Sequence, residues 1–307
     1  MIISDSVSVA GEHVAKKLPK VACLMAAHNG IFWIEEQVKS IINQHNVQIE
    51  LFISVDYCND GTYDWCIEKA KACPNVCVLE YGEVYGSASC NFYRLFSDVD
   101  FSNFNYVALA DQDDIWEVDH LICSIKEINN NKYDGVSSNL MAFEDNKPQN
   151  AFFINKSYEQ CKYDHFFESV GAGCTYVLTA NLANDFKIFC SKNTDSIVDI
   201  FGHDWLIYCF SRENGYSWGA LDIIGVNYRQ HSNNSMGANA GRNLFKRVKL
   251  VYHGWYQDQV VRIVRVVAPE KEILLANPML RIINFWNFRR RFRDKLILLF
   301  FFITGMY

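Results

Sequence analysis

The stretch "VACLMAAHNGIFWIEEQVKSIINQHNVQIELFISV", residues 21–55, contains two short apolar runs separated by a more polar segment. Residues 21–27 and 49–55 are continuous apolar runs of strand length, which is typical of strands buried on both faces. Between them, residues 32–45 repeat apolar side chains at the spacing of one helix face. A strand, a helix and a second strand in this order predict a βαβ unit with two parallel strands.

The same alternation continues along the first half of the chain. Further strands are expected at residues 76–81 and 106–110, and further helices at residues 62–73, 87–99 and 118–128. The predicted fold class is therefore α/β, with a Rossmann-like, mostly parallel central sheet flanked by helices. No GxGxxG follows the first strand and no GxxxxGK[ST] occurs, which argues against a dinucleotide-binding fold and a P-loop.

The composition narrows the class of protein. The 307 residues are 50% hydrophobic, enough for a full core in one large domain or somewhat more. A net charge of -6 argues against an extended nucleic-acid surface, so we expect no nucleic-acid partner. The eleven cysteines are scattered, without a CxxC pair, and no secretory signal precedes them. They indicate free thiols in a cytoplasmic protein rather than disulfides or a structural zinc site.

Polar segments follow three of the predicted strands. They are "AHNG" at residues 27–30, "VDYCNDGT" at residues 55–62 and "DQDD" at residues 111–114. Because ligands of open α/β sheets bind beyond the carboxyl ends of the strands, these segments are expected at one functional edge. The third holds three carboxylates within four residues, which repel one another unless a cation compensates them.

Three chemistries use closely spaced aspartates. A calcium EF-hand loop is excluded, because Ile115, Trp116 and Ile122 stand where it needs an oxygen ligand, a glycine and a glutamate. A phosphoaspartyl hydrolase would place its nucleophile after the first strand, whereas Asp111 follows the fourth. A divalent Mg²⁺ or Mn²⁺ held by one or two carboxylates and completed by substrate phosphates fits best. An ordinary solvated acidic turn stays open on the local sequence alone.

In this order, "AAHNG", "ISVDYCNDGT", "LADQDDIW", "HDW" and "YRQHSNN" resemble the family 2 nucleotide-sugar glycosyltransferases of GT-A fold. The resemblance is to the bacterial rhamnosyltransferase-like branch that builds O-antigens and capsules, and it covers residues 20 to about 237. It implies an N-terminal arm at residues 1–19 and a GT-A domain at residues 20–240. Residues 20–115 would form the nucleotide-binding half and residues 116–240 the acceptor-binding half.

The resemblance implies a pocket for a UDP- or dTDP-sugar after the first strand. Its lining would include Ala26, Ala27, His28 and Asn29. Asp56 would accept the N3–H of a uracil or thymine ring, and Asp60 with Gly61 and Thr62 would complete the turn. Many relatives have Asp-Asp-Gly-Ser where this chain has Val55-Asp56-Tyr57-Cys58, and Thr-Tyr-Asn in place of Ala27-His28-Asn29.

The resemblance also implies the reacting groups. Asp111 and Asp113 would form the DxD that holds Mn²⁺ or Mg²⁺, with Asp113 as the direct ligand and His231 as a further one. Asp114 would shape the sugar site, and Arg229 would contact the donor diphosphate. Asp204 in "HDW" would be the catalytic base of an inverting hexosyltransferase. The sugar would be rhamnose, or a hexose such as galactose or glucose, and the acceptor a polyprenyl-diphosphate-linked oligosaccharide.

Taken singly, these residues have simpler interpretations. Asp56 could be a turn residue, Asp204 the N-cap of a helix, and His231 a surface histidine. Gly171 and Gly173 allow a close backbone approach near the acceptor, or else a strand bulge. At the level of the whole chain, a non-catalytic scaffold of a polysaccharide assembly complex and a metal-dependent phosphohydrolase are the alternatives.

The C-terminal segment "RIINFWNFRRRFRDKLILLFFF", residues 281–302, mixes arginines with aromatic and aliphatic side chains. Within the helical extension expected at residues 241–307, it predicts attachment to the inner face of the plasma membrane through anionic headgroups and the acyl boundary. The aromatic residues proposed for this contact are Phe285, Trp286, Phe288 and Phe292. A helix that packs on the main domain through the same aromatics is the alternative.

Overall fold

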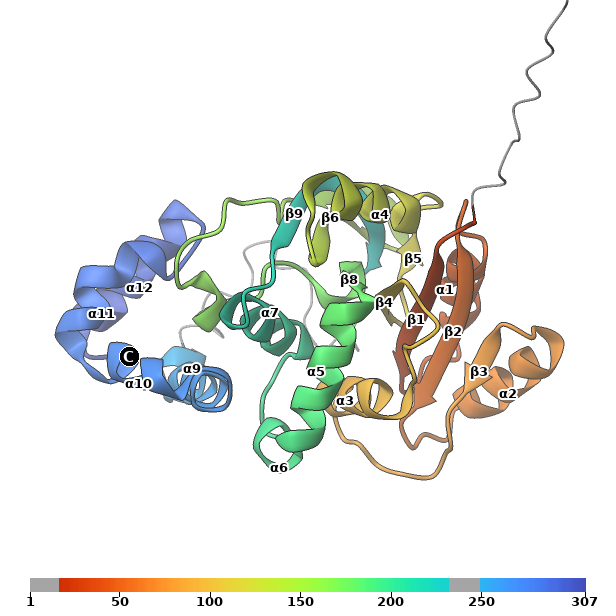
Figure 1. Ribbon diagram of the computed structural model, residues 1–307, viewed down its shortest axis with the longest axis horizontal. Helices are drawn as coiled ribbons and strands as arrows, with labels where there is room; N and C mark the ends of the chain where they lie inside the picture. The colour runs from red at the N-terminus through yellow and green to blue at the C-terminus, as the bar shows by residue number, and fades with distance from the viewer. Residues whose placement is uncertain (1–16, 232–248) are drawn as a thin grey trace, which may run out of the picture.

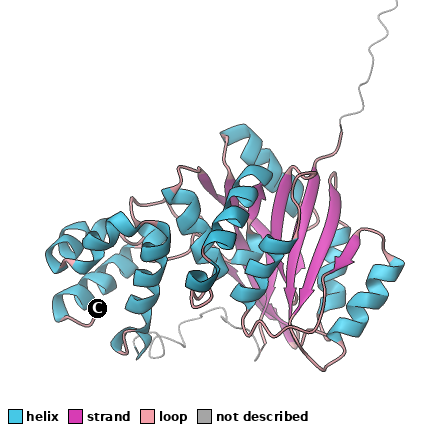
Figure 2. Cartoon of the chain, turned by 60° about the horizontal axis from the view of Figure 1, so that its bottom comes forward, coloured by secondary structure: helices cyan, strands magenta, loops and turns pink. Residues whose placement is uncertain are grey.

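The computed structural model describes residues 17–231 and 249–307. Most of the predicted arm, residues 1–16, lies outside the described residues, as do residues 232–248 at the junction predicted between domain and extension. In the described ranges, nine strands form one sheet in the order β3-β2-β1-β4-β8-β6-β9-β5, with β7 paired to β6. Helices cover both faces of this sheet (Figure 2).

The first four strands of the sheet are parallel, as the sequence predicts. They are β1 (Lys20–Ala27), β2 (Gln48–Val55), β3 (Val76–Val78) and β4 (Tyr106–Asp111). The register pairs Ala27 with Val55 and Ala26 with Asp111, so the chain leaves β1, β2 and β4 at the same edge. The three polar segments therefore begin side by side.

The second half of the sheet is mixed. Its strands are β5 (Ile115–Trp116), β6 (Gly135–Glu144), β7 (Lys147–Ile154), β8 (Val177–Thr179) and β9 (Trp218–Arg229). β8 is antiparallel to both β4 and β6, whereas β6 and β9 run parallel. The α/β class with flanking helices is confirmed, and the long parallel run is confined to the N-terminal half.

Strand β1 divides the core into two layers. Ala22, Leu24 and Ala26 face one layer, and the alternate residues Val21, Cys23, Met25 and Ala27 face the other. The second layer is covered by α1 (Ile34–Ile42), α2 (Thr62–Ala72) and α4 (His120–Asn131). The first is covered by α3 (Ala88–Asp98), α5 (Ala180–Lys192) and α7 (His203–Glu213) (Figure 1). A strand buried on both faces explains why residues 21–27 are apolar without alternation.

A helical extension follows the sheet and lies at one end of the molecule (Figure 1). It contains α9 (Trp255–Val267), α10 (Glu272–Ala276), α11 (Pro278–Asn284) and α12 (Phe292–Thr304). Phe288, between α11 and α12, is 0% exposed and stacks on Phe167 at a ring distance of 4.4 Å. No helix in the ranges 17–231 and 249–307 is both long and apolar enough to cross a membrane.

Buried charges join this extension to the main domain. Asp164, fully buried in the 3-10 helix Asp164–Phe166, accepts hydrogen bonds from Tyr208 (3.0 Å) and Arg212 (3.1 Å), and Arg290 approaches it at 3.5 Å. Lys271 of the extension also pairs with Glu213 of α7. Arg290 of the arginine-rich segment therefore packs against the main domain, as the alternative interpretation of that segment expects.

We expect Phe288→Ala to lower the free energy of unfolding by about 3–5 kcal/mol, because it opens a cavity between the extension and the domain. The exposed neighbour Phe292, 63% accessible, provides the matched control. Phe292→Ala should change stability by less than about 0.5 kcal/mol. Urea titration of both variants measures the difference, and equal midpoints would contradict this packing.

Candidate active site

Gln112 joins the acidic turn to the end of β1. Its side chain accepts a hydrogen bond from the His28 N–H (2.8 Å) and donates one to the His28 carbonyl (2.7 Å). A side chain at Gly30 would begin 2.1 Å from Gln112 Oε1, so only glycine allows this approach. The segments at residues 27–30 and 111–114 therefore form one surface, on which His28 and Asn29 are exposed and Ala26 and Ala27 lie beneath.

Asp60 supports the turn that precedes α2. Its carboxylate accepts hydrogen bonds from the Thr62 N–H (3.0 Å), the Thr62 hydroxyl (2.6 Å) and the Ile31 N–H (3.1 Å). Burial by itself would raise the pKa of Asp60, but the hydrogen bonds from Thr62 and Ile31 outweigh it and lower this pKa. Asp60 thus holds the ends of β1 and β2 together.

Asp56 lies just past β2 and is buried. Its Oδ1 accepts hydrogen bonds from the N–H groups of Tyr57 and Tyr85, both at 2.8 Å, and its Oδ2 accepts one from Gly86 at 2.9 Å. The carboxylate thereby fixes the loop that leads into α3, and Oδ2 keeps one lone pair for a further donor. Asp56 therefore connects its own turn to the distant backbone of Tyr85 and Gly86.

The acidic turn places its three carboxylates differently. Asp111 is partly buried at the end of β4, Asp113 is close to His231, with Oδ2 2.9 Å from Nε2, and Asp114 is 0% exposed. Asp114 Oδ1 accepts the Arg229 N–H at 3.0 Å, while its Oδ2 has no hydrogen-bond partner among the described residues. Asp114 therefore lies below the surface of the site, where it supports the turn.

The donor set of this turn fits a divalent cation. Asp111, Asp114 and Cys174 bring potential ligand atoms within 4.8 Å of one another, and Asp113 with His231 forms a second pair nearby. Carboxylate oxygens suit Mg²⁺ or Mn²⁺, which otherwise take ligands from substrate phosphates, whereas the imidazole and the thiol are softer ligands. Burial, followed by the charges of Asp113 and Asp111, raises the pKa of Asp114 well above its usual range. A cation would relieve this repulsion.

The end of β9 closes over the turn. The His231 ring stacks on Trp33 with a centroid distance of 3.9 Å and an interplanar angle of 7°. Arg229 is 3% exposed; its Nε donates to the Asp113 carbonyl at 2.8 Å, and its guanidinium pairs with Glu36 and Asp145. The Arg229 predicted to meet a diphosphate is thus held by two carboxylates in this structure, one from α1.

Asp204 lies in the first turn of α7, where Gly202 rather than Asp204 is the N-cap. Ser89 of α3 accepts hydrogen bonds from the N–H groups of Gly202 (3.0 Å) and His203 (3.1 Å), which satisfies the helix start from a distant segment. Asp204 Oδ1 accepts only the Trp205 N–H, at 2.8 Å. The N-cap interpretation of Asp204 is therefore wrong, because another side chain performs that role.

Asp204 and the acidic turn belong to one electrostatic site. Burial, followed by the charges of Asp113 and Asp204, raises the pKa of Asp111 to about 7. A side chain at Gly173 would begin 2.5 Å from His203 Nε2 and 3.2 Å from Asp204 Cβ, so this glycine permits a close approach. Gly173 belongs to the 3-10 helix Gly173–Thr175, and the bulge interpretation is not what the structure shows.

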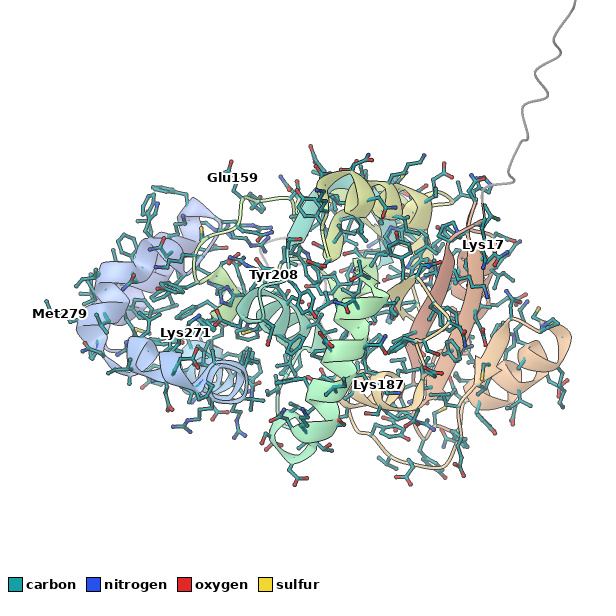
Figure 3. All side chains as sticks on the ribbon, viewed as in Figure 1. Lys17, Glu159, Lys187, Tyr208, Lys271 and Met279 are labelled. Carbon is teal, nitrogen blue, oxygen red and sulfur yellow. The ribbon has the colours of Figure 1, made fainter. Side chains whose placement is uncertain are left out.

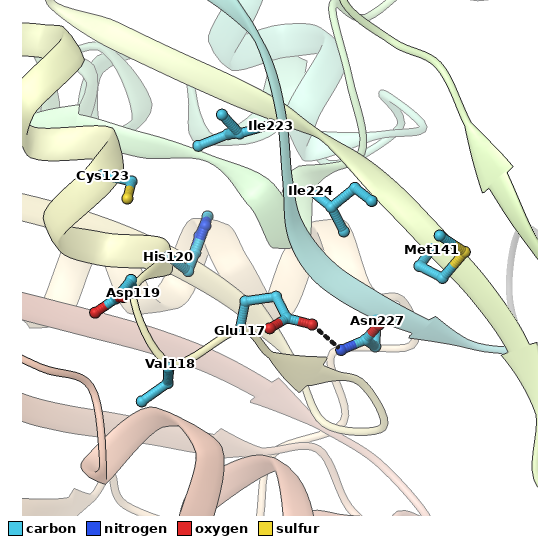
Figure 4. A pocket seen from close by; sticks show the side chains of 9 residues that line it. All are labelled: Glu117, Val118, Asp119, His120, Cys123, Met141, Ile223, Ile224 and Asn227. Carbon is cyan, nitrogen blue, oxygen red and sulfur yellow. Dashed lines mark hydrogen bonds between the residues drawn. The ribbon is translucent and has the colours of Figure 1, made fainter.

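A separate cavity of about 400 Å³ lies beside α4 and β9 (Figure 4). Glu117, which follows β5, accepts a hydrogen bond from Asn227 of β9 there at 2.7 Å. His120 also lines it; burial lowers the pKa of this histidine to about 4, so it is neutral at pH 7. None of the predicted site residues lines this cavity.

Solved structures of other proteins share the fold of this chain. Residues 1–349 of S. aureus TarS, solved with UDP-GlcNAc, superpose with a TM-score of 0.55 at 13% identity, covering 94% of this chain and 93% of that one. This chain spans 43% of a longer TarS chain. A mannosyltransferase from Pyrobaculum calidifontis, solved with GDP-Man and Mn²⁺, gives 0.53 at 15% identity, with coverages of 94% and 75%. The chain has the GT-A architecture of these structures.

The sequence comparisons identify the family. Residues 23–189 match the family described as Glycosyl transferase family 2. Over 292 residues the chain is 37% identical to the dTDP-rhamnosyl transferase RfbG of Shigella flexneri, covering 92% of this chain and 100% of that protein. This chain therefore belongs to glycosyltransferase family 2, and it is a glycosyltransferase.

Several side chains of the site were not predicted from the sequence. They are Trp33, Glu36, Ser89, Gln112, Asp145 and Cys174. Gln112 could have been noticed as the variable residue inside the DxD, and Trp33 as an aromatic at a predicted helix start. Ser89 and Asp145 reach the site from distant segments, and no local pattern marks such partners.

We expect Asp56→Asn to lower the free energy of unfolding by about 1–3 kcal/mol and to weaken binding of dTDP or UDP. An amide group must turn its NH₂ toward at least one of the three N–H donors, leaving a buried group unsatisfied. Asp64→Asn, at an exposed position of α2, is the control. Calorimetry and thermal denaturation measure the effects; equal nucleotide affinity in all three proteins would remove Asp56 from the site.

Proposed function

We propose that this chain is an inverting, metal-dependent glycosyltransferase that moves rhamnose from a dTDP-sugar to a lipid-linked oligosaccharide in O-antigen or capsule synthesis. The observation that carries this proposal is the 37% identity to the dTDP-rhamnosyl transferase of Shigella flexneri over the full length of that protein. A UDP-linked galactose or glucose is the alternative donor, supported by neighbours solved with UDP and UDP-GlcNAc.

We assign donor binding to the half formed by residues 20–115 and acceptor binding to residues 116–240. The exposed His28 and Asn29 form the open side of the nucleotide site, and Asp56 presents its remaining lone pair to the base. A carboxylate acceptor matches the N3–H of uracil or thymine, whereas adenine has no ring N–H there. The guanidinium of Arg229 contacts the diphosphate when this more highly charged anion displaces the carboxylates of Glu36 and Asp145.

We assign a Mn²⁺ or Mg²⁺ ion to Asp113, Asp111 and His231. Asp113 Oδ2 and His231 Nε2 are 2.9 Å apart, so both atoms could contribute to holding the same ion. When bound, such an ion neutralises the charge that develops on the departing diphosphate. Trp33, stacked on His231, fixes the plane of the imidazole.

We assign the general base to Asp204. Its Oδ1 is held by the Trp205 N–H, whereas its Oδ2 makes no hydrogen bond to the described residues and is free to take a proton. An acceptor hydroxyl is a weak nucleophile, and removal of its proton as it attacks the anomeric carbon supports a direct displacement. A single displacement inverts the configuration at that carbon.

We place the enzyme in the cytoplasm, on the inner face of the plasma membrane, with the extension at residues 241–307 as its contact. Phe288 is in the core and Phe285 is partly buried, but other apolar side chains of the extension are exposed. On α11 and just after it these are Met279, Ile282, Ile283 and Trp286, and on α12 they are Phe292, Leu296, Phe300 and Ile303. Met279 projects from the end of the extension, away from the sheet (Figure 3). Such a surface fits an acyl boundary.

We expect purified enzyme to release dTDP from dTDP-rhamnose in the presence of lipid-linked acceptor and Mn²⁺ or Mg²⁺, and to lose this activity in EDTA. Asp113→Ala should lose it as well, because the ion would lack its direct carboxylate ligand. Asp119→Ala, an exposed acidic residue outside the turn, should stay active. Full turnover in EDTA would rule out the metal. UDP-galactose and UDP-glucose, tested in parallel, identify the donor.

We expect Asp204→Asn to fold and to bind dTDP as the wild type does, while sugar transfer falls by about 10²–10⁴-fold, the usual contribution of a positioned base. The amide preserves the hydrogen bond from Trp205 but accepts no proton. Asp199→Asn, at an exposed position just before α7, should transfer at the wild-type rate. A folded Asp204→Asn variant with normal turnover would show that the base lies elsewhere.

A further inference from the structure

Two segments far apart in the sequence lie against each other between the domain and its extension. They are residues 155–163, which follow β7, and residues 287–291, which precede α12. The Tyr163 N–H donates to the Asn287 carbonyl at 3.0 Å, and the Cys161 thiol to the Arg289 carbonyl at 3.3 Å. Their junction carries three cationic side chains, Lys156, Arg290 and Arg291, which we call the basic seam.

Arg290 is the structural member of the basic seam. Its guanidinium donates to the carbonyls of Lys156 (3.2 Å), Val170 (2.9 Å) and Ser169 (2.8 Å). Oxygens of Asp164 and Glu168 also lie 3.5 Å from its Nε. The charge of Arg290 is therefore compensated within the protein.

Lys156 and Arg291 are held in place but not compensated. The backbone N–H of Lys156 donates to Asn139 Oδ1 at 2.7 Å. The guanidinium of Arg291 donates to the Asn155 carbonyl at 2.8 Å and lies over the Tyr158 ring at 4.6 Å. Among the described residues, no carboxylate oxygen lies within 4.0 Å of either cationic group. Burial, together with Arg291 and Arg290, lowers the pKa of Lys156. Two recessed cations that no described carboxylate contacts indicate a site for an anion.

The basic seam lies between the proposed base and the exposed apolar helix. Arg290 donates to the carbonyls of Ser169 and Val170, four and three residues before Gly173, whose backbone adjoins Asp204. The charge of Asp204 also acts on Lys156. On the other side, Arg291 immediately precedes α12 and its exposed Phe292. A ligand lying along this path would place a sugar near Asp204, an anionic group at the basic seam and an apolar chain along α12.

We propose that Lys156 and Arg291 bind the diphosphate of the lipid-linked acceptor, with its sugar directed toward Asp204 and its apolar chain along α12. This inference rests on the proposed function and names how the same site recognises its second substrate. A diphosphate suits the pair, because guanidinium and ammonium groups form charge-assisted hydrogen bonds with phosphate oxygens. Phe292, Leu296, Phe300 and Ile303 supply an apolar surface for the lipid chain.

The first test measures binding without turnover. Calorimetry with farnesyl diphosphate, in saturating dTDP so that the donor site is occupied, should give a Kd that rises about 10- to 100-fold in Lys156→Gln and in Arg291→Gln. Lys156→Arg should keep most of the affinity. Lys126→Gln and Arg293→Gln, which remove exposed charges, are the matched controls and should bind as the wild type does. Equal affinity in all variants, or no binding by the wild type, would overturn the inference.

The second test compares two acceptors that carry the same sugar, one on an alkyl diphosphate and one on a plain alkyl ether. Lys156→Gln and Arg291→Gln should raise KM for the first about 10- to 100-fold, with kcat little changed, and should leave KM for the second unaltered. An equal loss with both acceptors would show a role in folding or in positioning Asp204 instead. Diphosphate-dependent binding without any sugar transfer by the wild type would support the basic seam while refuting the proposed function.

Discussion

The carboxylate of Asp114 is buried beside those of Asp111 and Asp113, with Asp204 close enough to raise the pKa of Asp111. Charges gathered in this way are costly in a protein interior unless hydrogen bonds, cations or metal ions compensate them. At the end of β9, the Arg229 N–H donates to Asp114 and the His231 ring lies against the Asp113 carboxylate. The Arg229 guanidinium donates to the Asp113 carbonyl and pairs with Glu36 and Asp145. These contacts hold the end of β9 against the acidic turn.

A second set of buried charges, centred on Asp164, joins α7 to the helical extension. Asp164 accepts a hydrogen bond from Tyr208 and pairs with Arg212, both of α7, and it lies close to Arg290 beside the extension. Phe288 packs nearby against Phe167. Because α7 also carries Asp204, the extension and the proposed base are mechanically connected. An extension attached in this way is packed against the main domain through buried side chains.

The arginine-rich segment at residues 289–291 illustrates how one composition serves several roles. Arg289 and Arg290 pair with Glu168, and Arg290 also binds main-chain carbonyls, whereas Arg291 keeps its charge uncompensated. Exposed apolar residues begin directly afterwards, at Phe292. Domain packing, a basic seam and an apolar face therefore follow one another within a few residues. Phe288 and Arg290 thus follow the packing interpretation, whereas the exposed apolar side chains are those that we propose for membrane contact.

The sequence by itself determined the α/β class, the first four strands and the meeting of three polar segments at one edge. These follow from local periodicity and from one geometric rule, that the carboxyl ends of parallel strands share an edge. The resemblance to family 2 glycosyltransferases also indicated Asp111, Asp113 and Asp204. Local patterns were sufficient to predict those helices and strands whose formation depends on residues close together in the sequence.

Only the tertiary structure decided how those residues are supported. Ser89, more than a hundred residues away in the sequence, accepts a hydrogen bond from the first turn of α7. Trp33 orients His231 by stacking on it, and Arg229 is paired with carboxylates from two other segments. It also separated Phe288, in the core, from the exposed Phe292, although both lie in the same aromatic run. The physical reason is that such partners are chosen by packing between distant segments, where a hydrogen bond or a buried ring depends on three-dimensional proximity and leaves no periodic trace in the chain.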